Sequence, residues 1–519
     1  MEQGTRREFL HEVGKGVITA SVGASLAAEL GAESAMADHA DRPLSFGRLE
    51  PLAAAFQERT AEQALPLAVE RLSQGGDLRE IVAAAALANA RAFGGEDYVG
   101  FHAFMALMPA YLMSRESPQG RKALPVLKVL YRSTGQIQAK GGRAAEVLHT
   151  IGAQPMREGA SPRAEFLEAE RGRQTERAEG LFAAMVDRSA TDAFDDLQAL
   201  VHDDTDVHRV VLAYRAWDLL GLTGREHAHT TLRQSVRYCL STEKNRVARG
   251  YPEPGIRATL PKVLDQYRIA QRMPGTRAAD ETWLRAFVDT LLSSEPAQAA
   301  EAVGAALADG FSLDAIGEAL SLAATQQVLR DPGRTVATPG KPVGSVHGDS
   351  VGVHASDSMS AWRNIAKVCR PNTAMAGLIV AGYHLSFASG GRVWKGLEAY
   401  PRRQTDLNAL PTESAALLRE LDGAIRENDQ ARAAALARRY GDRDHAPRPI
   451  FDMFLRYATS EDGALHAEKY YRTVADEFAR SRKSTRWQHV TALARVTASE
   501  YGKRADGYEQ ACSLLKITS

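Results

Sequence analysis

The spacing of apolar residues predicts helices along almost the whole chain. Apolar positions recur every three or four residues over long runs, as they do along one face of an α-helix. Alternating runs of β-branched residues bounded by turn signals are missing from the sequence, so the pattern predicts an all-α fold. The predicted helices span 61–74, 77–93, 101–116, 122–138, 162–186, 192–202, 207–220, 226–240, 281–292, 297–308, 312–329, 350–368, 374–387, 413–427, 430–440, 466–481 and 485–501.

Turn residues separate these helices into parts of one large helical body. The stretches 154–162 and 331–345 contain Pro and Gly and are predicted loops. Asp77, with Glu80 three residues later, predicts a helix start with a capping box. We divide the chain into a signal segment, 1–37, and three helical parts, 38–160, 161–335 and 336–519.

One segment resembles another at a constant offset of 145 residues. Nine of 41 aligned positions are identical between 201–241 and 346–386, among them Trp217 and Trp362. The alignment also places His202 on His347. We therefore expect a duplicated helix pair, with Val-His-x-Asp turns before two equivalent helices.

The N-terminus has the order of an export signal. Arg6 and Arg7 precede Phe9 and Leu10 as in a twin-arginine motif, and a weakly apolar stretch follows. The sequence Ala35-Met36-Ala37 supplies a small-x-small cleavage site. The apolar stretch is shorter than the roughly 20 residues of a membrane span. We expect the twin-arginine machinery to export a soluble mature protein without a membrane span to the periplasm or cell envelope.

Composition excludes several classes of protein. The chain of 519 residues carries 64 basic and 64 acidic residues, and without residues 1–37 its formal charge is +2. Such a balance argues against binding to nucleic acid. Three cysteines, Cys239, Cys369 and Cys512, are too few and too scattered for a disulfide framework or a thiolate metal site.

Histidines supply the candidate chemistry. His102, His208 and His354 are the predicted ligands or acid–base groups, and His466 is a fourth candidate metal ligand. Asp204 with Thr205, and Asp349 with Ser350, suit helix N-caps or groups that orient the imidazoles. Each histidine taken alone is better explained as a hydrogen-bonded core or surface residue, whereas the histidines taken as a set fit a functional site as well as a structural one.

Other motifs are weaker. No His-Glu-x-x-His motif occurs; Glu146 precedes His149 by three residues, and Asp442 precedes His445 by three. Gly348-Asp349-Ser350-Val351-Gly352 matches the pattern of a nucleophile elbow, which makes a serine hydrolase at Ser350 a minor alternative, although a loop precedes the motif where the elbow requires a strand.

Four stretches together resemble an uncharacterised family of twin-arginine-exported, all-helical bacterial proteins. They also resemble, more faintly, the helical region beside Rieske-type domains and questin-oxidase-like proteins. The stretches are 99–103, 207–221, 353–362 and 466–471. The resemblance implies an all-α fold, converging histidines and oxidative chemistry. The Cys-x-His pairs of a Rieske cluster are absent from the sequence, so no iron–sulfur centre is implied.

Two functions from different classes fit these features. The first is an exported enzyme of redox or metal-assisted chemistry, with a mononuclear metal ion or acid–base histidines in a His-lined pocket that takes a small-molecule substrate. The second is a non-catalytic helical scaffold that binds a partner or small ligand in the same cleft. Convergence of the rings of His102, His208 and His354 to about 5–7 Å favours the enzyme, given metal–nitrogen bonds of about 2 Å.

Overall fold

The protein is all-helical in the computed structural model, which describes residues 43–388, 394, 396–401 and 407–518. This part of the chain contains 22 α-helices and no β-strand, which confirms the predicted fold class. Only isolated β-bridges, such as Pro43 with His149, join extended residues. The predicted export signal, 1–37, lies outside the described residues. None of the described helices is both long and apolar enough to cross a lipid bilayer.

The first half of the chain contains eleven of these helices. They are α3 (Glu50–Glu58), α4 (Ala61–Ser73), α5 (Leu78–Phe93), α6 (Tyr98–Glu116), α7 (Leu124–Ala139), α8 (Pro162–Arg171), α9 (Thr175–Arg188), α10 (Ala190–Val201), α11 (Val207–Thr223), α12 (Ala228–Ala248) and α13 (Ile256–Gln266).

The second half continues in the same way. It contains α14 (Glu281–Leu291), α15 (Pro296–Ala308), α16 (Leu313–Arg330), α17 (Val351–Val368), α18 (Pro371–Ala388), α20 (Ser414–Arg426), α21 (Gln430–Asp442), α22 (Pro447–Ser460), α23 (His466–Arg480), α24 (Trp487–Glu500) and α25 (Tyr508–Leu514).

Most predicted helices are present, and the differences have local causes. The predicted helix 162–186 is two helices, because the chain turns at Gly172–Gln174 with Arg173 in the left-handed region (φ 58°). Asp77 caps α5 as predicted, but the capping box does not form, because Glu80 pairs with Arg71 at 3.2 Å instead. The helices α3, α13, α22 and α25 were not predicted.

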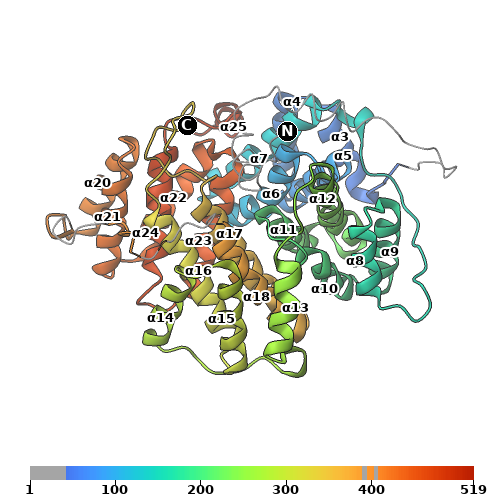
Figure 1. Ribbon diagram of the computed structural model, residues 1–519. Helices are drawn as coiled ribbons and strands as arrows, with labels where there is room; N and C mark the ends of the chain where they lie inside the picture. The colour runs from blue at the N-terminus through green and yellow to red at the C-terminus, as the bar shows by residue number, and fades with distance from the viewer. Residues whose placement is uncertain (1–42, 389–393, 395, 402–406, 519) are drawn as a thin grey trace.

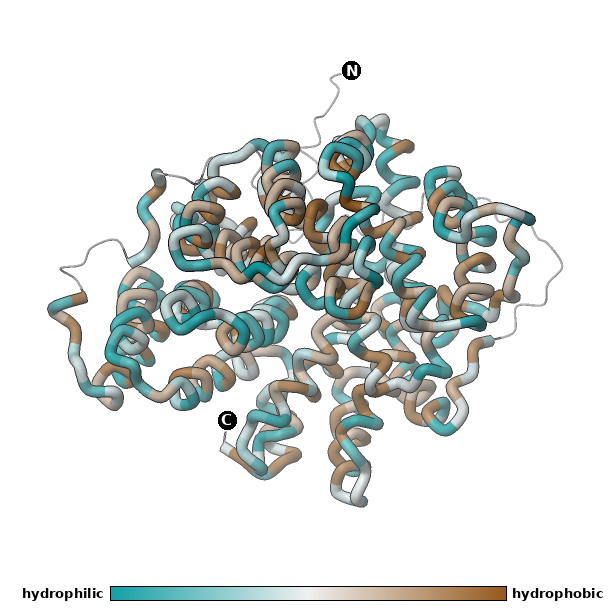
Figure 2. Tube along the Cα trace, turned by 90° about the horizontal axis from the view of Figure 1, so that it is seen from below, coloured by the Kyte–Doolittle hydropathy of each residue, from teal (hydrophilic) through white to brown (hydrophobic). Residues whose placement is uncertain are grey.

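Two hydrophobic clusters form the interior. The larger one, the first core, takes in α3 to α18 and the returning helix α25. The smaller one, the second core, is built from α20 to α24 with residues of α16 and α17 such as Val328 and Val353. Figure 2 shows hydrophobic positions interleaved with hydrophilic ones along most helices, as expected when one face of each helix is buried.

Four helices form a ring at the junction of the two cores. α6 packs against α11, α11 against α17, α17 against α23, and α23 against α6. In Figure 1 these helices lie in the middle of the molecule, between α20–α22 on one side and α8–α9 on the other. We call α6, α11, α17 and α23 the central ring.

The two segments of the internal echo each fold as a helix pair. Segment 201–241 contains α11 and the first part of α12, and segment 346–386 contains α17 and most of α18. Each pair packs internally, and α11 also packs against α17. Their origin by duplication, and the division at residues 160 and 335, stay predictions.

Close approach of α17 to α16 depends on a glycine. A Cβ atom added to Gly352 would lie 2.6 Å from the backbone nitrogen of Val328 in α16. Since backbone cannot move aside as a flexible side chain does, α17 would have to shift at its N-terminal end. This is the end that carries His354, so the glycine helps to place a candidate site residue.

We therefore expect Gly352→Ala to lower the free energy of unfolding by about 1–3 kcal/mol, as overpacking commonly does. Gly221→Ala is the matched control, because Gly221 is also helical and its added Cβ meets nothing within 4 Å. That substitution is expected to be neutral or to stabilise by up to about 1 kcal/mol through helix propensity. Urea denaturation followed by circular dichroism measures both; equal effects of the two variants would contradict the close-packing argument.

Candidate functional site

Each helix of the central ring contributes one histidine to a common cluster. The ring centroids are 4.8 Å apart for His102–His208 and 5.8 Å for His208–His354. They are 5.2 Å apart for His354–His466 and 5.1 Å for His466–His102. We call these four residues the His tetrad. The structure thus places all four of the sequence-predicted site histidines side by side, at separations close to or within the expected range.

The tetrad lies where four helices begin. His208 and His354 are in the first turns of α11 and α17, as expected, and His466 is the first residue of α23. His102 lies in the second turn of α6. A helix N-terminus carries a partial positive charge, so these four ends together disfavour protonation of the imidazoles.

Hydrogen bonds at Nδ1 orient two of the rings. Nδ1 of His102 lies 2.7 Å from the backbone oxygen of Tyr98, which can only accept, so His102 donates from Nδ1. Nδ1 of His208 lies 3.4 Å from Oδ1 of Asp206. The Nε2 atoms of both histidines are buried and, among the described residues, have no hydrogen-bond partner. In the neutral His102 tautomer, Nε2 therefore carries a lone pair.

The other two histidines face each other directly. Nε2 of His354 lies 3.2 Å from Nε2 of His466. Only one of two neutral imidazoles can donate in such a contact. A cluster of buried acceptor nitrogens of this kind needs a proton, a water molecule or a cation, because unpaired buried acceptors are costly.

Aromatic rings enclose the tetrad. The centroid of Tyr98 is 4.3 Å from that of His102, and Phe101 is 5.1 Å from His208. Tyr238 lies 6.2 Å from His208 and donates its hydroxyl hydrogen to Asp206. Tyr98 is 36% exposed, whereas Phe101 and Tyr238 are buried. The tetrad therefore lies close beneath the surface on the side of Tyr98.

Burial keeps the site histidines neutral. Burial, with smaller contributions from His208 and Lys469, lowers the pKa of His354 to about 3. Burial and the nearby Lys469 also hold the pKa values of His102 and His466 well below the usual range. Burial lowers the pKa of Lys469 itself to about 8. At neutral pH these three imidazoles offer lone pairs, and Lys469 is a buried proton donor.

Asp206 is the carboxylate of the site. Although burial opposes its ionisation, His208 and the Tyr238 hydroxyl hold the pKa of Asp206 below its usual range. An ionised Asp206 behind Nδ1 of His208 fixes the orientation of that ring. Carboxylates stand behind metal-binding histidines in the same way.

The chain that leads into His466 is held in an unusual conformation. Ala464 (φ 46°) and Leu465 (φ 66°) both occupy the left-handed region, which costs about 1–3 kcal/mol per non-glycine residue. Lys128 of α7 fixes this segment, since its Nζ lies 2.6 Å from the backbone oxygen of Glu461 and 2.6 Å from Glu468. Surrounding structure therefore maintains a strained approach to the tetrad.

Gly348 packs against the same residue. A Cβ added to Gly348 would lie 2.4 Å from Cβ of His466, and its amide donates to Glu500 at 2.8 Å. Burial raises the pKa of Glu500 to about 7. The loop before α17 thus meets the first turn of α23 without space for a side chain.

The predicted caps are only partly correct. Ser350 is the N-cap of α17 and accepts from the amide of Val353. Asp349 instead pairs with Arg334 and Lys341, the latter at 2.8 Å. Neither Asp204 nor Thr205 caps α11, which begins after Asp206; Oδ1 of Asp204 accepts from the Thr205 amide at 2.7 Å. The closer Asp206 takes the place expected for Asp204 beside His208.

The weaker motifs do not assemble sites of their own. Glu146 pairs with Arg91 at 3.1 Å and lies outside any helix, so it shares no helical face with His149. His445 lies 2.8 Å from the backbone oxygen of Thr412. A turn precedes Ser350 where a nucleophile elbow requires a strand. The three cysteines are free, and Cys239 and Cys512 are buried.

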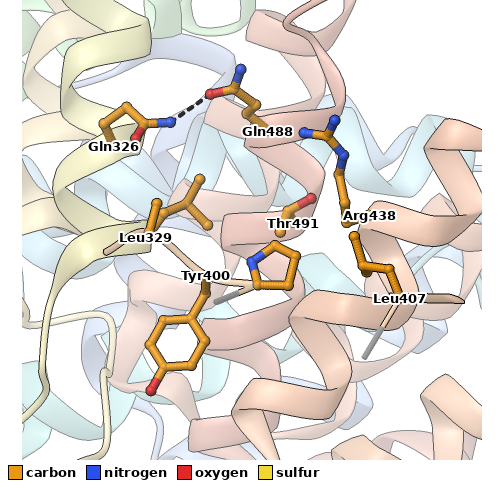
Figure 3. A pocket seen from close by; sticks show the side chains of 9 residues that line it. Gln326, Leu329, Tyr400, Leu407, Arg438, Gln488 and Thr491 are labelled. Atoms are coloured by element: carbon orange, nitrogen blue, oxygen red, sulfur yellow. Dashed lines mark hydrogen bonds between the residues drawn. The ribbon is translucent and has the colours of Figure 1, made fainter. Parts of the chain in front are cut away.

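A separate hollow lies among the C-terminal helices (Figure 3). It has a volume of about 260 Å³ and is lined by residues of α16, α21 and α24 and by Ala399, Tyr400, Pro401 and Leu407. Gln326 donates to Gln488 across it at 2.6 Å, and Arg438 lies on its wall. No tetrad residue lines this hollow, and its lining contains no histidine.

Comparison with protein-family models, with curated proteins and with solved structures finds no match to this chain. Within the described ranges, no group of three or more His, Cys, Asp or Glu side chains is placed so that it could hold a metal ion. The chemistry of the site therefore has to be argued from its own residues.

Sequence patterns missed three residues of the site: Tyr98, Asp206 and Lys469. Each had a detectable signal. Tyr98 precedes His102 by four residues and Lys469 follows His466 by three, so each shares a helical face with its histidine. Asp206 is two residues from His208, at the helix start.

The lowered histidine pKa values predict acid sensitivity. Unfolded histidines take up a proton near pH 6.5, whereas folded His354 does so only near pH 3. Between these values the unfolded state binds more protons, so the free energy of unfolding falls as the pH decreases. Each such histidine contributes a slope of up to about 1.4 kcal/mol per pH unit. Urea denaturation at pH 7, 6 and 5 gives the free energy of unfolding at each pH, and this free energy should change less with pH in His354→Gln than in the unmodified protein. An equal change with pH in both proteins would contradict a neutral, buried His354.

Proposed function

We propose that the His tetrad binds one transition-metal ion and that the protein is an enzyme of redox or metal-assisted chemistry acting on a small molecule. The observation that carries the proposal is the set of buried imidazole nitrogens that face one another without sufficient hydrogen-bond donors. Two Nε2 atoms are unpartnered and two are 3.2 Å apart. An ion among them satisfies all four lone pairs at once.

The separations fit ligands of one ion. With metal–nitrogen bonds of about 2.1 Å, two tetrahedral ligand atoms lie about 3.4 Å apart and two adjacent octahedral ones about 3.0 Å apart. The corresponding imidazole centroids lie about 5.2 Å and about 4.5 Å apart. The Nε2 atoms of His354 and His466 are 3.2 Å apart, and the four consecutive centroid distances are 4.8–5.8 Å. The four rings as they stand in the described residues are not placed to hold an ion, so metal binding would require the imidazoles to reorient toward one point.

The surroundings favour a reactive ion over a purely structural one. Imidazole ligands suit Fe, Cu, Ni and Zn. Neutral imidazole ligands contribute no negative charge, and Lys469 and four helix N-termini add positive potential around the one carboxylate of the site, Asp206. This potential favours an anionic oxygen group, from water or from a substrate, next to the ion. Tyr98 lies on the side from which such a molecule would approach.

Metal binding by single variants tests the proposal. The full-length protein, stripped with a chelator, should bind close to one equivalent of Co²⁺, with visible absorption bands that report nitrogen ligation. Alanine variants of His102, His208, His354 and His466 should each bind at least about 100-fold more weakly, because each removes a ligand. His445→Ala is the control, since His445 bonds to a backbone oxygen away from the tetrad, and should bind as the unmodified protein does.

The Asp206→Asn variant tests whether Asp206 positions the imidazole of His208 or is needed for folding of the protein as a whole. If Asp206 orients His208, this variant should keep one equivalent of Co²⁺ but bind it about 10–100-fold more weakly. Circular dichroism checks that each variant is folded. A folded, unmodified protein that binds none of Co²⁺, Fe²⁺, Cu²⁺ or Zn²⁺ would exclude the metal-dependent enzyme and leave the helical scaffold as the function.

We also propose that the folded protein is exported by the twin-arginine route, because Arg6 and Arg7 match the motif that this route recognises. That route carries proteins folded before export, which suits a buried ion inserted during folding. In cells, Arg6→Lys with Arg7→Lys should retain the protein in the cytoplasm, whereas the control Lys15→Arg should leave it in the periplasmic fraction. Immunoblotting of the fractions measures the distribution; export of the double variant would contradict the assigned route.

A further inference from the structure

A second hollow, lined by none of the tetrad histidines, combines an apolar wall with a partly buried cation. Its volume is about 450 Å³, within the range of small-molecule sites. Leu260 and Leu264 of α13 and Leu167 of α8 line the apolar wall, together with Ile256 and Ile269. Arg163 and His202 supply polar atoms. No tetrad residue lines this hollow, so binding here is independent of the proposed metal site.

Arg163 is the cation without a close counter-charge. Its ion pair with Asp195 spans 3.9 Å, and its Nη1 donates to the Thr373 hydroxyl at 3.0 Å, so no carboxylate lies in close contact with it. Asp195 is already bound by Arg370, which donates from Nε at 2.6 Å and from its backbone nitrogen at 2.7 Å. Burial lowers the pKa of Arg163 even with Asp195 and Asp196 nearby, which indicates that the cation is incompletely compensated.

The other arginines of the hollow are paired. Arg257 lies 2.7 Å from Asp203 and 2.9 Å from Glu243, and Arg171 also pairs with Asp203. The lining therefore contains three guanidinium groups and one carboxylate, that of Asp203. Among the lining cations, Arg163 is the one left to bind a charged ligand.

Two further groups beside Arg163 point to a ligand. His202 is 4% exposed, and its Nε2 has no hydrogen-bond partner among the described residues. Ser161 is the N-cap of α8, yet its hydroxyl does not cap the helix. A ligand oxygen placed near the start of α8 would meet the guanidinium, this hydroxyl and the positive end of a ten-residue helix.

We infer that this hollow binds an amphipathic anion, with a single carboxylate on Arg163 and an apolar chain along the leucines of α13 and α8. A guanidinium matches a carboxylate in shape and donates two parallel hydrogen bonds to it. The apolar wall buries the chain, which supplies the nonpolar part of the binding free energy.

Calorimetric titration of the full-length protein with decanoate tests the inference, with uncharged decanamide as the matched probe. We expect saturable binding of one decanoate per chain and at least about tenfold weaker binding of decanamide, because a hydrogen bond to a charged group is lost. Arg163→Met should reduce decanoate affinity at least about tenfold and leave decanamide affinity unchanged. Leu260 is partly exposed at the edge of the hollow, so a tryptophan there would fill the hollow. Leu260→Trp should therefore weaken the binding of decanoate and of decanamide.

Arg285→Met is the control, since Arg285 is 73% exposed on α14 and pairs with Glu281 outside the hollow. It should bind decanoate as the unmodified protein does. Equal affinity of the unmodified protein for decanoate and decanamide would by itself overturn the inference, whatever the variants show. So would the absence of decanoate binding at millimolar concentration, or undiminished binding by a folded Arg163→Met protein.

Discussion

The structure depends on burying four imidazoles at the meeting point of four helix N-termini. A buried imidazole stays neutral and needs a partner for each nitrogen. The backbone oxygen of Tyr98 and the carboxylate of Asp206 lie at the Nδ1 atoms of His102 and His208. The Nε2 atoms of these two rings have no partner among the described residues, and those of His354 and His466 face each other. The chemistry available to the site follows from that imbalance of acceptors over donors.

The surrounding fold is built to keep this arrangement in place. Gly348 and Gly352 allow the loop before α17 and α17 itself to approach their neighbours at backbone distance. Lys128 fixes the strained turn before His466 by binding backbone oxygens and the carboxylate of Glu468. Such backbone strain persists only where its surroundings enforce it, and it is concentrated at functional sites.

Sequence periodicity predicted the fold class and most helices, because a half-buried helix must repeat its apolar residues every three or four positions. The tetrad histidines were found because imidazole is the side chain best suited to metal and proton chemistry near neutral pH. Which carboxylate would orient them could not be predicted: Asp204 and Asp206 are two residues apart, and the exact start of α11 decides which one lies beside His208. The sequence did not indicate Arg163 as a binding residue. Its lack of a close counter-ion arises only in the folded structure, where Arg370 donates to Asp195.

The tetrad also spans the boundary between the two hydrophobic cores. His102 and His208 belong to helices of the first core, whereas α23, with Tyr470 and Tyr471, packs into the second. The four rings therefore meet where the two cores pack together. An ion bound there would link the helices of the two cores, and its binding free energy would add to the free energy of unfolding of the protein.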